Sequence, residues 1–210
     1  MARRKQEAPA IHRKRIASAA HILFHENGIS SVTMDDIAKA AGYSKATLYV
    51  YFQNKEELVS FLVLESMQKL YDAILSALES HKDTQERFYA ICSGLVKYQH
   101  DFPFYFRLVQ EQINIDFSHR DYFPEEKETY LVGEKINEAL FLFLQEGIAR
   151  GELRSDFDLK PTIFMLWGTL AGIIQLSVNK AAYIQQEMTL SQDDFLKQSF
   201  SLIYRSIAAQ

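Results

Sequence analysis

The segment from Thr33 to Phe52 constrains the fold more than any other part of this sequence. Thr33 and Asp36 have the spacing of a capping box, in which the threonine hydroxyl accepts a hydrogen bond from the third helical amide and the carboxylate reaches back. Gly42 supplies the backbone freedom that a sharp turn needs, and Ser44 is a favourable N-cap for a following helix. The segment therefore predicts two short helices joined by a tight turn.

The second of these helices has a polar outer side. Its helical periodicity predicts that four side chains face outward, namely Lys45, Thr47, Tyr49 and Tyr51. Three others point inward, namely Ala46, Leu48 and Phe52. Lysine, threonine and tyrosine can all bind phosphates or base edges, whereas a solvated helix without a partner more often carries Glu and Lys pairs. The pattern is that of a DNA-reading helix-turn-helix, although its spacing alone also fits a plain helical hairpin.

A longer set of positions carries a family resemblance through its order and spacing. These positions are Ile16, Ala19, Ala20, Leu23, Phe24, Gly28, Thr33, Ile37, Ala38, Ala41, Gly42, Ser44, Thr47, Leu48, Tyr49, Tyr51, Phe52, Lys55 and Leu58. With them, the stretch from Ile16 to Leu58 resembles the N-terminal domain of TetR-type transcriptional regulators. Beyond this stretch, only the length and the helical pattern agree. Val50 departs from the family pattern, because relatives often carry a polar or aromatic residue there, and this departure is expected to alter the DNA sequence preference.

Charge is distributed unevenly along the chain. The formal net charge of −4 does not by itself suggest a nucleic-acid-binding protein. Residues 1–60, however, hold nine Lys or Arg and six Asp or Glu, a net charge of +3, whereas residues 61–210 hold fourteen and twenty-one, a net charge of −7. A basic head on an acidic body confines DNA affinity to the N-terminal part.

The hydrophobic periodicity is helical throughout, which predicts an all-α fold of two domains. Residues 1–53 are expected to form a three-helix helix-turn-helix DNA-binding domain, ordered from about residue 11. Residues 54–210 are expected to form a helical effector-binding and dimerisation domain. A long helix from Lys55 to Ser80, started by an Asn54 N-cap, joins the two domains without a flexible linker.

Caps, prolines and apolar stripes predict the other helices. They are expected over Ile11–His25, from Asp83 to about His100, from Pro103 onward, from Pro124 to about Arg150, from Asp156 or Asp158 through the apolar run Ile163–Leu176, and from Ser191, which forms a capping box with Asp194. Residues 114–124 lose periodicity and are predicted to form a loop or broken helix. The apolar run is apolar on nearly all sides, which predicts burial on more than one side, and it is too short to span a membrane.

The C-terminal helices predict dimerisation and ligand binding. The all-round apolar helix and the amphipathic last helix are suited to pairing with their copies in a four-helix bundle, which predicts a homodimer through the last two helices. Packing within one chain is the alternative. Aromatic and polar side chains on the middle helices predict a site for a small apolar or aromatic effector, although each aromatic alone also fits an ordinary core position. The candidate effector residues are Phe88, Tyr98, Phe102, Phe106, Gln110, Tyr130, Glu134, Asn137, Phe141, Phe164 and Trp167.

The sequence carries no motif for catalysis or metal binding. Its single cysteine, Cys92, excludes an intrachain disulfide and fits a buried inert thiol. The six histidines lack metal-ligand spacing, and no P-loop, nucleophile elbow or GxGxxG motif occurs. We therefore expect a protein that is not an enzyme and that binds neither a metal nor a cofactor.

The resemblance implies a repressor that binds a palindromic operator as a homodimer and is released by an unknown small effector. Double-stranded operator DNA, a second copy and that effector are thus the expected partners. No apolar segment of a signal peptide follows the basic start of the chain, so a cytoplasmic protein is expected. Lys55 matches the family's phosphate-contacting lysine. The expected DNA-binding residues are Thr33, Tyr43, Ser44, Lys45, Thr47, Tyr49, Tyr51 and Lys55.

Two alternatives of other classes stay open. One is a ligand-independent DNA-binding protein whose helical body recruits a protein partner. The other is a helical carrier of small molecules with a vestigial helix-turn-helix. The predicted exposure of Lys45, Tyr49 and Lys55 argues against the carrier, and nothing in the sequence excludes the partner-recruiting protein.

Overall fold

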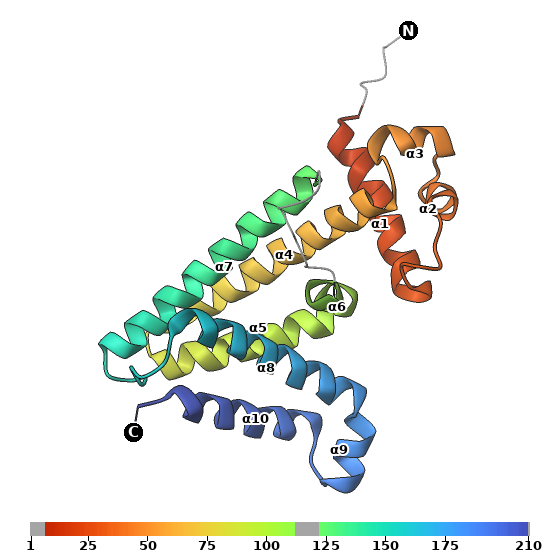
Figure 1. Ribbon diagram of the computed structural model, residues 1–210. Coiled ribbons are helices and arrows are strands. Elements are labelled where there is room, and N and C mark those ends of the chain that lie inside the picture. The colour runs from red at the N-terminus through yellow and green to blue at the C-terminus, as the bar shows by residue number, and fades with distance from the viewer. Residues whose placement is uncertain (1–6, 112–121, 210) are drawn as a thin grey trace. The chain divides into compact units, whose positions relative to one another are not determined.

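The structure is a computed structural model that describes residues 7–111 and 122–209 (Figure 1). The regular secondary structure in these two ranges is helical, apart from one isolated β-bridge between Leu153 and Ala208. The predicted all-α fold is therefore confirmed. Most of the loop predicted over residues 114–124 lies outside the described residues. The helices are α1 (Pro9–Asn27), α2 (Met34–Ala41), α3 (Lys45–Tyr51), α4 (Lys55–Ser80), α5 (Thr84–Asp101), α6 (Pro103–Glu111), α7 (Pro124–Ala149), α8 (Leu159–Asn179), α9 (Ala181–Glu187) and α10 (Gln192–Ile207).

The chain divides into two compact units. The first unit contains Met1–Ser66 and Arg107–Thr129, and the second contains Met67–Phe106 and Tyr130–Gln210. The first unit therefore holds α1, α2 and α3, and the second holds α5, α8, α9 and α10. Helices α4, α6 and α7 each contribute residues to both units.

Local chemistry places the ends of α2 and α3. The hydroxyl of Thr33 accepts a hydrogen bond of 3.2 Å from the Asp36 amide, and the Asp36 carboxylate accepts one of 3.0 Å from the Thr33 amide. Gly42 ends α2 in the left-handed conformation at φ 74°, where a side chain would be strained. The Ser44 hydroxyl then caps α3 by accepting a 3.1 Å hydrogen bond from the Thr47 amide. The predicted caps and turn are all confirmed.

The apolar sides of α1, α2, α3 and the start of α4 enclose the core of the first unit. Leu48 and Phe52 are fully buried, as predicted. Ala46 is exposed, so its predicted inward position is wrong. A seven-residue helix buries only a narrow stripe, and Leu48 alone occupies it in α3. The main side chains of this core are Ile16, Ala20, Phe24, Ile37, Leu48, Phe52 and Leu58.

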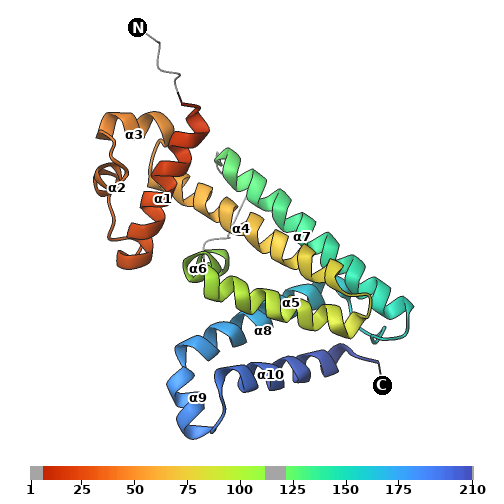
Figure 2. The same cartoon turned by 180° about the vertical axis from the view of Figure 1, so that it is seen from behind.

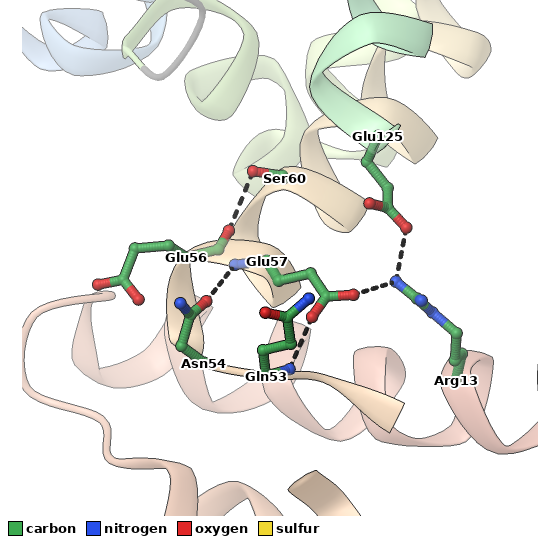
Figure 3. A network of polar contacts seen from close by, with 7 residues as sticks. All are labelled: Arg13, Gln53, Asn54, Glu56, Glu57, Ser60 and Glu125. Carbon is green, nitrogen blue, oxygen red and sulfur yellow. Dashed lines mark hydrogen bonds and ion pairs between the residues drawn. The ribbon is translucent and has the colours of Figure 1, made fainter. Parts of the chain in front are cut away.

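An ion cluster inside the first unit joins three helices (Figure 3). The guanidinium of Arg13, on α1, lies 3.2 Å from a carboxylate oxygen of Glu57, on α4, and 2.6 Å from one of Glu125, on α7. Glu57 also accepts a 2.6 Å hydrogen bond from the Gln53 amide, and its own amide donates to the Asn54 side chain at 2.8 Å. The predicted Asn54 cap of α4 is thus confirmed, and it belongs to a network that reaches α1 and α7.

The second unit is built around α5, α8 and α10. Figures 1 and 2 both show α8 and α10 side by side, and α8 also packs against α5. The Asp83 and Ser191 side chains cap α5 and α10 as predicted. Asp158 precedes α8 but makes no side-chain cap, and its carbonyl instead accepts a hydrogen bond from the Thr162 hydroxyl. The short helix α9 was not predicted, because Ala181–Glu187 carries neither an N-cap side chain nor a long apolar stripe.

Helix α8 is apolar on all sides but is not covered on all sides within one chain. It buries side chains such as Ile163, Leu170 and Ile174 against its neighbours, while Phe164 remains 68% exposed. The predicted burial on more than one side is therefore not found in the single chain. The helix has 21 residues, more than the apolar run inside it, and by length and composition alone it is long enough to cross a membrane. Its packing within the second unit accounts for its buried side.

Candidate DNA-binding surface and apolar cavities

The outer side of α3 presents the side chains that the sequence assigned to DNA binding. Tyr49 is 43% exposed and Val50 is 77% exposed. The Thr47 hydroxyl lies 2.8 Å from that of Ser44, so these two hydroxyls are held together at the start of the helix. Leu48 anchors the opposite side of the helix in the core. Helix α3 is thus a rigid support with a short polar and aromatic surface.

Lys45 is already paired within the protein. Its ammonium lies 2.8 Å from the carboxylate of Asp35 on α2, and the two side chains are 61% and 49% exposed. The hydrogen bond to Asp35 raises the pKa of Lys45. An exposed ion pair of this kind contributes little free energy to stability. The ammonium can therefore leave Asp35 and bind a phosphate or a base edge at small cost. The spacing between residues 35 and 45 did not reveal this pair, because it depends on how α2 and α3 cross.

Thr33 serves first as the cap of α2. Besides accepting the Asp36 amide, its hydroxyl donates to the Asp36 carboxylate at 2.6 Å. These hydrogen bonds from the hydroxyl and the amide of Thr33 lower the pKa of Asp36. The amide and the hydroxyl of Thr33 are therefore both already engaged with Asp36. The predicted role of Thr33 at the DNA backbone stays a prediction.

Lys55 has a structural role that the sequence did not show. Its ammonium donates to the backbone carbonyls of Ile29 at 2.9 Å, Val32 at 3.1 Å and Ser30 at 3.4 Å. An ammonium has three protons, and here all three point at the loop that joins α1 to α2. These carbonyl dipoles explain why a lysine is tolerated in the first turn of α4, where the helix dipole opposes it. A phosphate contact by Lys55 would have to share or break at least one of these hydrogen bonds.

Replacing Lys55 by methionine is expected to lower the free energy of unfolding by about 1–3 kcal/mol, because charged hydrogen bonds to half-buried carbonyls are lost. Urea unfolding of the full chain measures this change. Lys39→Met, at an exposed position on α2, is the control and should stay within about 0.5 kcal/mol of the unchanged protein. Unchanged stability combined with weakened binding to every DNA sequence would instead assign Lys55 to a phosphate.

An aromatic cluster lies beside the end of α3, and only part of it was predicted from the sequence. The ring of His12, on α1, stacks on Tyr51 at a centroid distance of 5.1 Å and meets Tyr43 edge-on at 5.8 Å. The His12 Nδ1 atom lies 2.6 Å from the Tyr43 hydroxyl. Tyr43 and Tyr51 were predicted to hold the DNA backbone, but His12 was not. The distance of 31 residues between His12 and Tyr43 hides this contact from the sequence.

Two cavities lie in the second unit. The larger is an open groove of about 700 Å³ between α4 and α5. Its lining combines small side chains with Tyr89, Tyr98, Phe102 and two lysines. The smaller is an enclosed space of about 40 Å³. It is lined only by apolar and aromatic side chains, among them Phe88, Leu95, Phe143 and Trp167.

The structure divides the predicted effector residues among several environments. Phe88 and Trp167 line the enclosed cavity, whereas Tyr98 and Phe102 line the groove. Phe106 is fully buried, with its ring 6.0 Å from that of Tyr98. Five of the others are exposed or half-buried on α7 or α8, namely Tyr130, Glu134, Asn137, Phe141 and Phe164, and Gln110 is exposed on α6. The predicted set is therefore not one site in this structure, and its role stays a prediction.

The small residues that line the groove were not predicted from the sequence, where only aromatic and polar side chains indicated a ligand site. A helical spacing of small residues on α4 and a matching set on α5 was the available signal. These small lining residues are Ala73, Ser76, Ala77, Ser80, Ala90, Ser93 and Gly94.

The single cysteine lies in the core of the second unit. Cys92 is fully buried, and this burial raises the pKa of its thiol. A thiol of this kind is not a reactive nucleophile. No group of three or more His, Cys, Asp or Glu side chains in residues 7–111 and 122–209 could hold a metal ion.

Comparison with known proteins decides the family. Residues 16–60 match the family described as "Bacterial regulatory proteins, tetR family". This matched segment belongs to the TetR family of transcriptional regulators. Together with the relatives described below, the match identifies the chain as a regulator and not an enzyme. The matched residues include all of α2 and α3, so the family match covers the helix-turn-helix and the surface described above.

The similarity to known proteins extends beyond the segment of residues 16–60. The fatty acid metabolism regulator protein of Bacillus subtilis is 26% identical over 79% of this chain and 82% of its own length. The regulator TtgR of Pseudomonas putida is 36% identical, but the match spans only 40% of this chain and 39% of that relative. The crystal structure of FadR from Bacillus subtilis in complex with stearoyl-CoA shares the fold with a TM-score of 0.68 at 19% identity, over 91% of this chain and 97% of the other.

Proposed function

We propose that this TetR-family regulator is a repressor that binds a palindromic operator as a homodimer and is released by an effector with a long apolar chain. In this proposal residues 1–53 are the DNA-binding domain and residues 54–210 are the effector-binding and dimerisation domain. The protein would act in the cytoplasm, where its DNA is. The observation that carries the proposal is the exposed helix α3, capped by Ser44, within the part of the chain that matches the family.

Binding of α3 in the major groove accounts for the exposed residues on this surface. Lys45, Thr47 and Tyr49 would contact base edges or adjacent phosphates. Tyr43, Ser44 and Tyr51 would hold the backbone on both sides of the helix, because Tyr43 and Ser44 precede α3 and Tyr51 is its last residue. Thr33 and Lys55 complete the predicted set, although the structure gives both of them internal hydrogen bonds as well.

The exposed side of α8 supports the homodimer. Phe164, Gly168, Gly172 and Leu176 recur at four-residue intervals, and all four are exposed. A side chain placed at either glycine would meet no atom within 4 Å in the chain. Leu202, on α10, is 63% exposed as well. An isologous pairing of α8 and α10 with their copies would cover this surface, and the glycines would allow a close approach of the helices.

The effector class rests on the relatives and on the apolar cavities. One relative is named a fatty acid metabolism regulator, and a protein of the same fold was crystallised with stearoyl-CoA. The enclosed cavity offers only apolar walls, as an acyl chain requires. At about 40 Å³ it is too small to admit such a chain, so Phe88 and Trp167 would have to move apart on binding. That movement gives the ligand-bound and ligand-free states different structures, which release from DNA requires.

Binding to duplex DNA from upstream of the protein's own gene, compared with a scrambled duplex at two salt concentrations, tests the proposal. We expect tighter, salt-sensitive binding to the upstream DNA. Tyr49→Ala should reduce the preference for that DNA by about 10- to 100-fold, and Tyr183→Ala, at an exposed position on α9, should not. Stearoyl-CoA should weaken DNA binding, whereas coenzyme A alone should leave it unchanged.

Each part of the proposal can fail separately. Equal, weak binding to both duplexes, followed by no enrichment in a selection from random DNA, would contradict the regulator's sequence-specific role. Specific DNA binding that stearoyl-CoA strengthens would contradict release. Specific binding with no response to acyl ligands would favour the alternative, in which the second unit recruits a protein partner.

A further inference from the structure

We propose that Arg15, His12 and Tyr43 form a binding site for a DNA backbone phosphate and that the Glu7 carboxylate occupies this site in the absence of DNA. The inference rests on the proposed DNA-binding function and extends it. It adds two residues of α1 to the DNA surface, and it makes the Glu7 side chain a competitor of DNA.

The four side chains form a closed ring of contacts. The Nη1 atom of Arg15 donates to the Tyr43 hydroxyl at 3.1 Å, and its Nη2 atom lies 3.3 Å from a carboxylate oxygen of Glu7. The same oxygen lies 3.9 Å from His12 Nε2, while His12 Nδ1 lies 2.6 Å from the Tyr43 hydroxyl. Arginine can only donate, so the Tyr43 oxygen accepts from it and the Tyr43 proton can go to His12. Arg15 and His12 thus share two oxygens, the hydroxyl oxygen of Tyr43 and one carboxylate oxygen of Glu7.

The Glu7 carboxylate shows that this cluster binds an oxyanion. The guanidinium of Arg15 is fork-shaped and suits carboxylate and phosphate equally well. Glu7 and Arg15 are each about half exposed, at 48% and 50%, so the pair lies at the surface, where another anion can replace the carboxylate. His12 is more enclosed at 18%, because it stacks on Tyr51.

The location of the cluster identifies the anion. Tyr43 lies in the turn between α2 and α3, and Tyr51 is the last residue of α3. Figures 1 and 2 both show the beginning of α1 beside the end of α3. A helix that enters the major groove has a sugar–phosphate backbone on either side. The oxyanion nearest to this cluster in a complex would therefore be a backbone phosphate, and Glu7 would have to leave it.

Binding of the full-length protein to a fluorescein-labelled duplex of random sequence, measured by anisotropy at several salt concentrations, tests this site. Arg15→Gln should weaken binding and reduce the slope of log affinity against log salt by about 0.9 for each head bound. Glu7→Gln should strengthen binding by about two- to fivefold for each head, because an exposed ion pair no longer competes. This gain should disappear when Glu7→Gln is combined with Arg15→Gln.

The control is Glu26→Gln, which removes an exposed carboxylate at the other end of α1. Its effect on DNA affinity should be small and the same with and without Arg15. A Glu7→Gln gain that persists in the Arg15→Gln protein would mean that Glu7 acts only through its long-range charge, and would refute the site. An unchanged salt slope in a folded Arg15→Gln protein would refute it as well.

Two further measurements keep the test decisive. Circular dichroism shows whether Arg15→Gln is folded; if it is not, Arg15→Lys replaces it in the cycle, because lysine keeps the charge but loses the fork. In that case a Glu7→Gln gain of the same size with Arg15 and with Lys at this position would contradict a fork-bound anion. Absence of any DNA binding by the unchanged protein would refute the proposed function itself. DNA binding by the unchanged protein, with the same affinity in the Arg15→Gln and Glu7→Gln variants, would refute this site alone.

Discussion

Replacing Arg13 by methionine is expected to lower the free energy of unfolding by about 3–5 kcal/mol, the largest stability effect that we predict for a single substitution. Methionine keeps most of the volume but leaves Glu57 and Glu125 facing each other without a counter-charge. The side chains of these carboxylates are only 8% and 12% exposed, so water can stabilise them little. The substitution also removes the guanidinium from the face of Phe52, 4.3 Å away. Urea unfolding followed by circular dichroism measures the loss.

The neighbouring residue provides the control for Arg13. Lys14 is exposed on the same helix, and Lys14→Met should stay within about 0.5 kcal/mol of the unchanged protein. If the cost arises from the orphaned carboxylates, adding Glu57→Gln and Glu125→Gln to Arg13→Met should restore part of the stability, because neutral amides are cheaper to bury than unpaired charges. Equal unfolding midpoints for Arg13→Met and Lys14→Met would show that the cluster does not stabilise the first unit.

Replacing Phe164 by glutamate is expected to raise the dissociation constant of the proposed homodimer by about a thousandfold. A buried aromatic side chain at the centre of an interface contributes about 2 kcal/mol or more, and the two-fold symmetry of a dimer doubles the effect. The single chain should keep its fold, because Phe164 is 68% exposed there. Sedimentation equilibrium measures the dimer, and circular dichroism verifies the fold. Operator affinity should fall together with the dimer, because the two half-sites are then bound separately.

Leu142→Glu is the matched control for Phe164. It introduces the same charge at an apolar side chain of α7 that is 47% exposed but does not belong to the α8 and α10 surface. Its dimer should remain intact. A Phe164→Glu protein that sediments as a dimer, at concentrations where the unchanged protein does, would exclude this side of α8 from the interface.

Much of the first unit follows from the sequence, because capping is a local interaction. The contacts between Thr33 and Asp36, between Ser44 and Thr47, and at the Asn54 cap span only three residues each. The backbone conformation that brings such residues together is set by the same few residues, so their identity predicts the structure. The family resemblance, based on the same stretch, was confirmed by the match to residues 16–60.

The position of the predicted DNA-binding side chains was also accessible from the sequence, but their partners were not. Periodicity placed Tyr49 outside and Leu48 inside, as found. It failed at Ala46, because a short helix contacts its neighbours along one stripe only. It did not reveal that Lys45 pairs with Asp35, or that Lys55 donates to the loop after α1. Both contacts depend on how separate helices meet.

The effector prediction shows the same limit more strongly. Each of the predicted side chains lies on a helix that the sequence located approximately, yet they are divided between the groove, the enclosed cavity and the surface. Helical periodicity gives the angle of a side chain about its own axis. It does not give the neighbour that this side faces, and a cavity is a property of several helices together.

The sequence by itself determined where α2, α3 and α4 begin and which side of α3 faces outward. The reason is that these features depend on residues within about one helical turn of each other. The order and spacing of such local signals also determined the resemblance to the TetR family. Only the tertiary structure decided which distant charges meet. Arg13 reaches Glu125 across 112 positions in the chain, and Lys55 reaches back 26 positions to Ile29. Such pairs depend on the packing of whole helices, which the entire core determines.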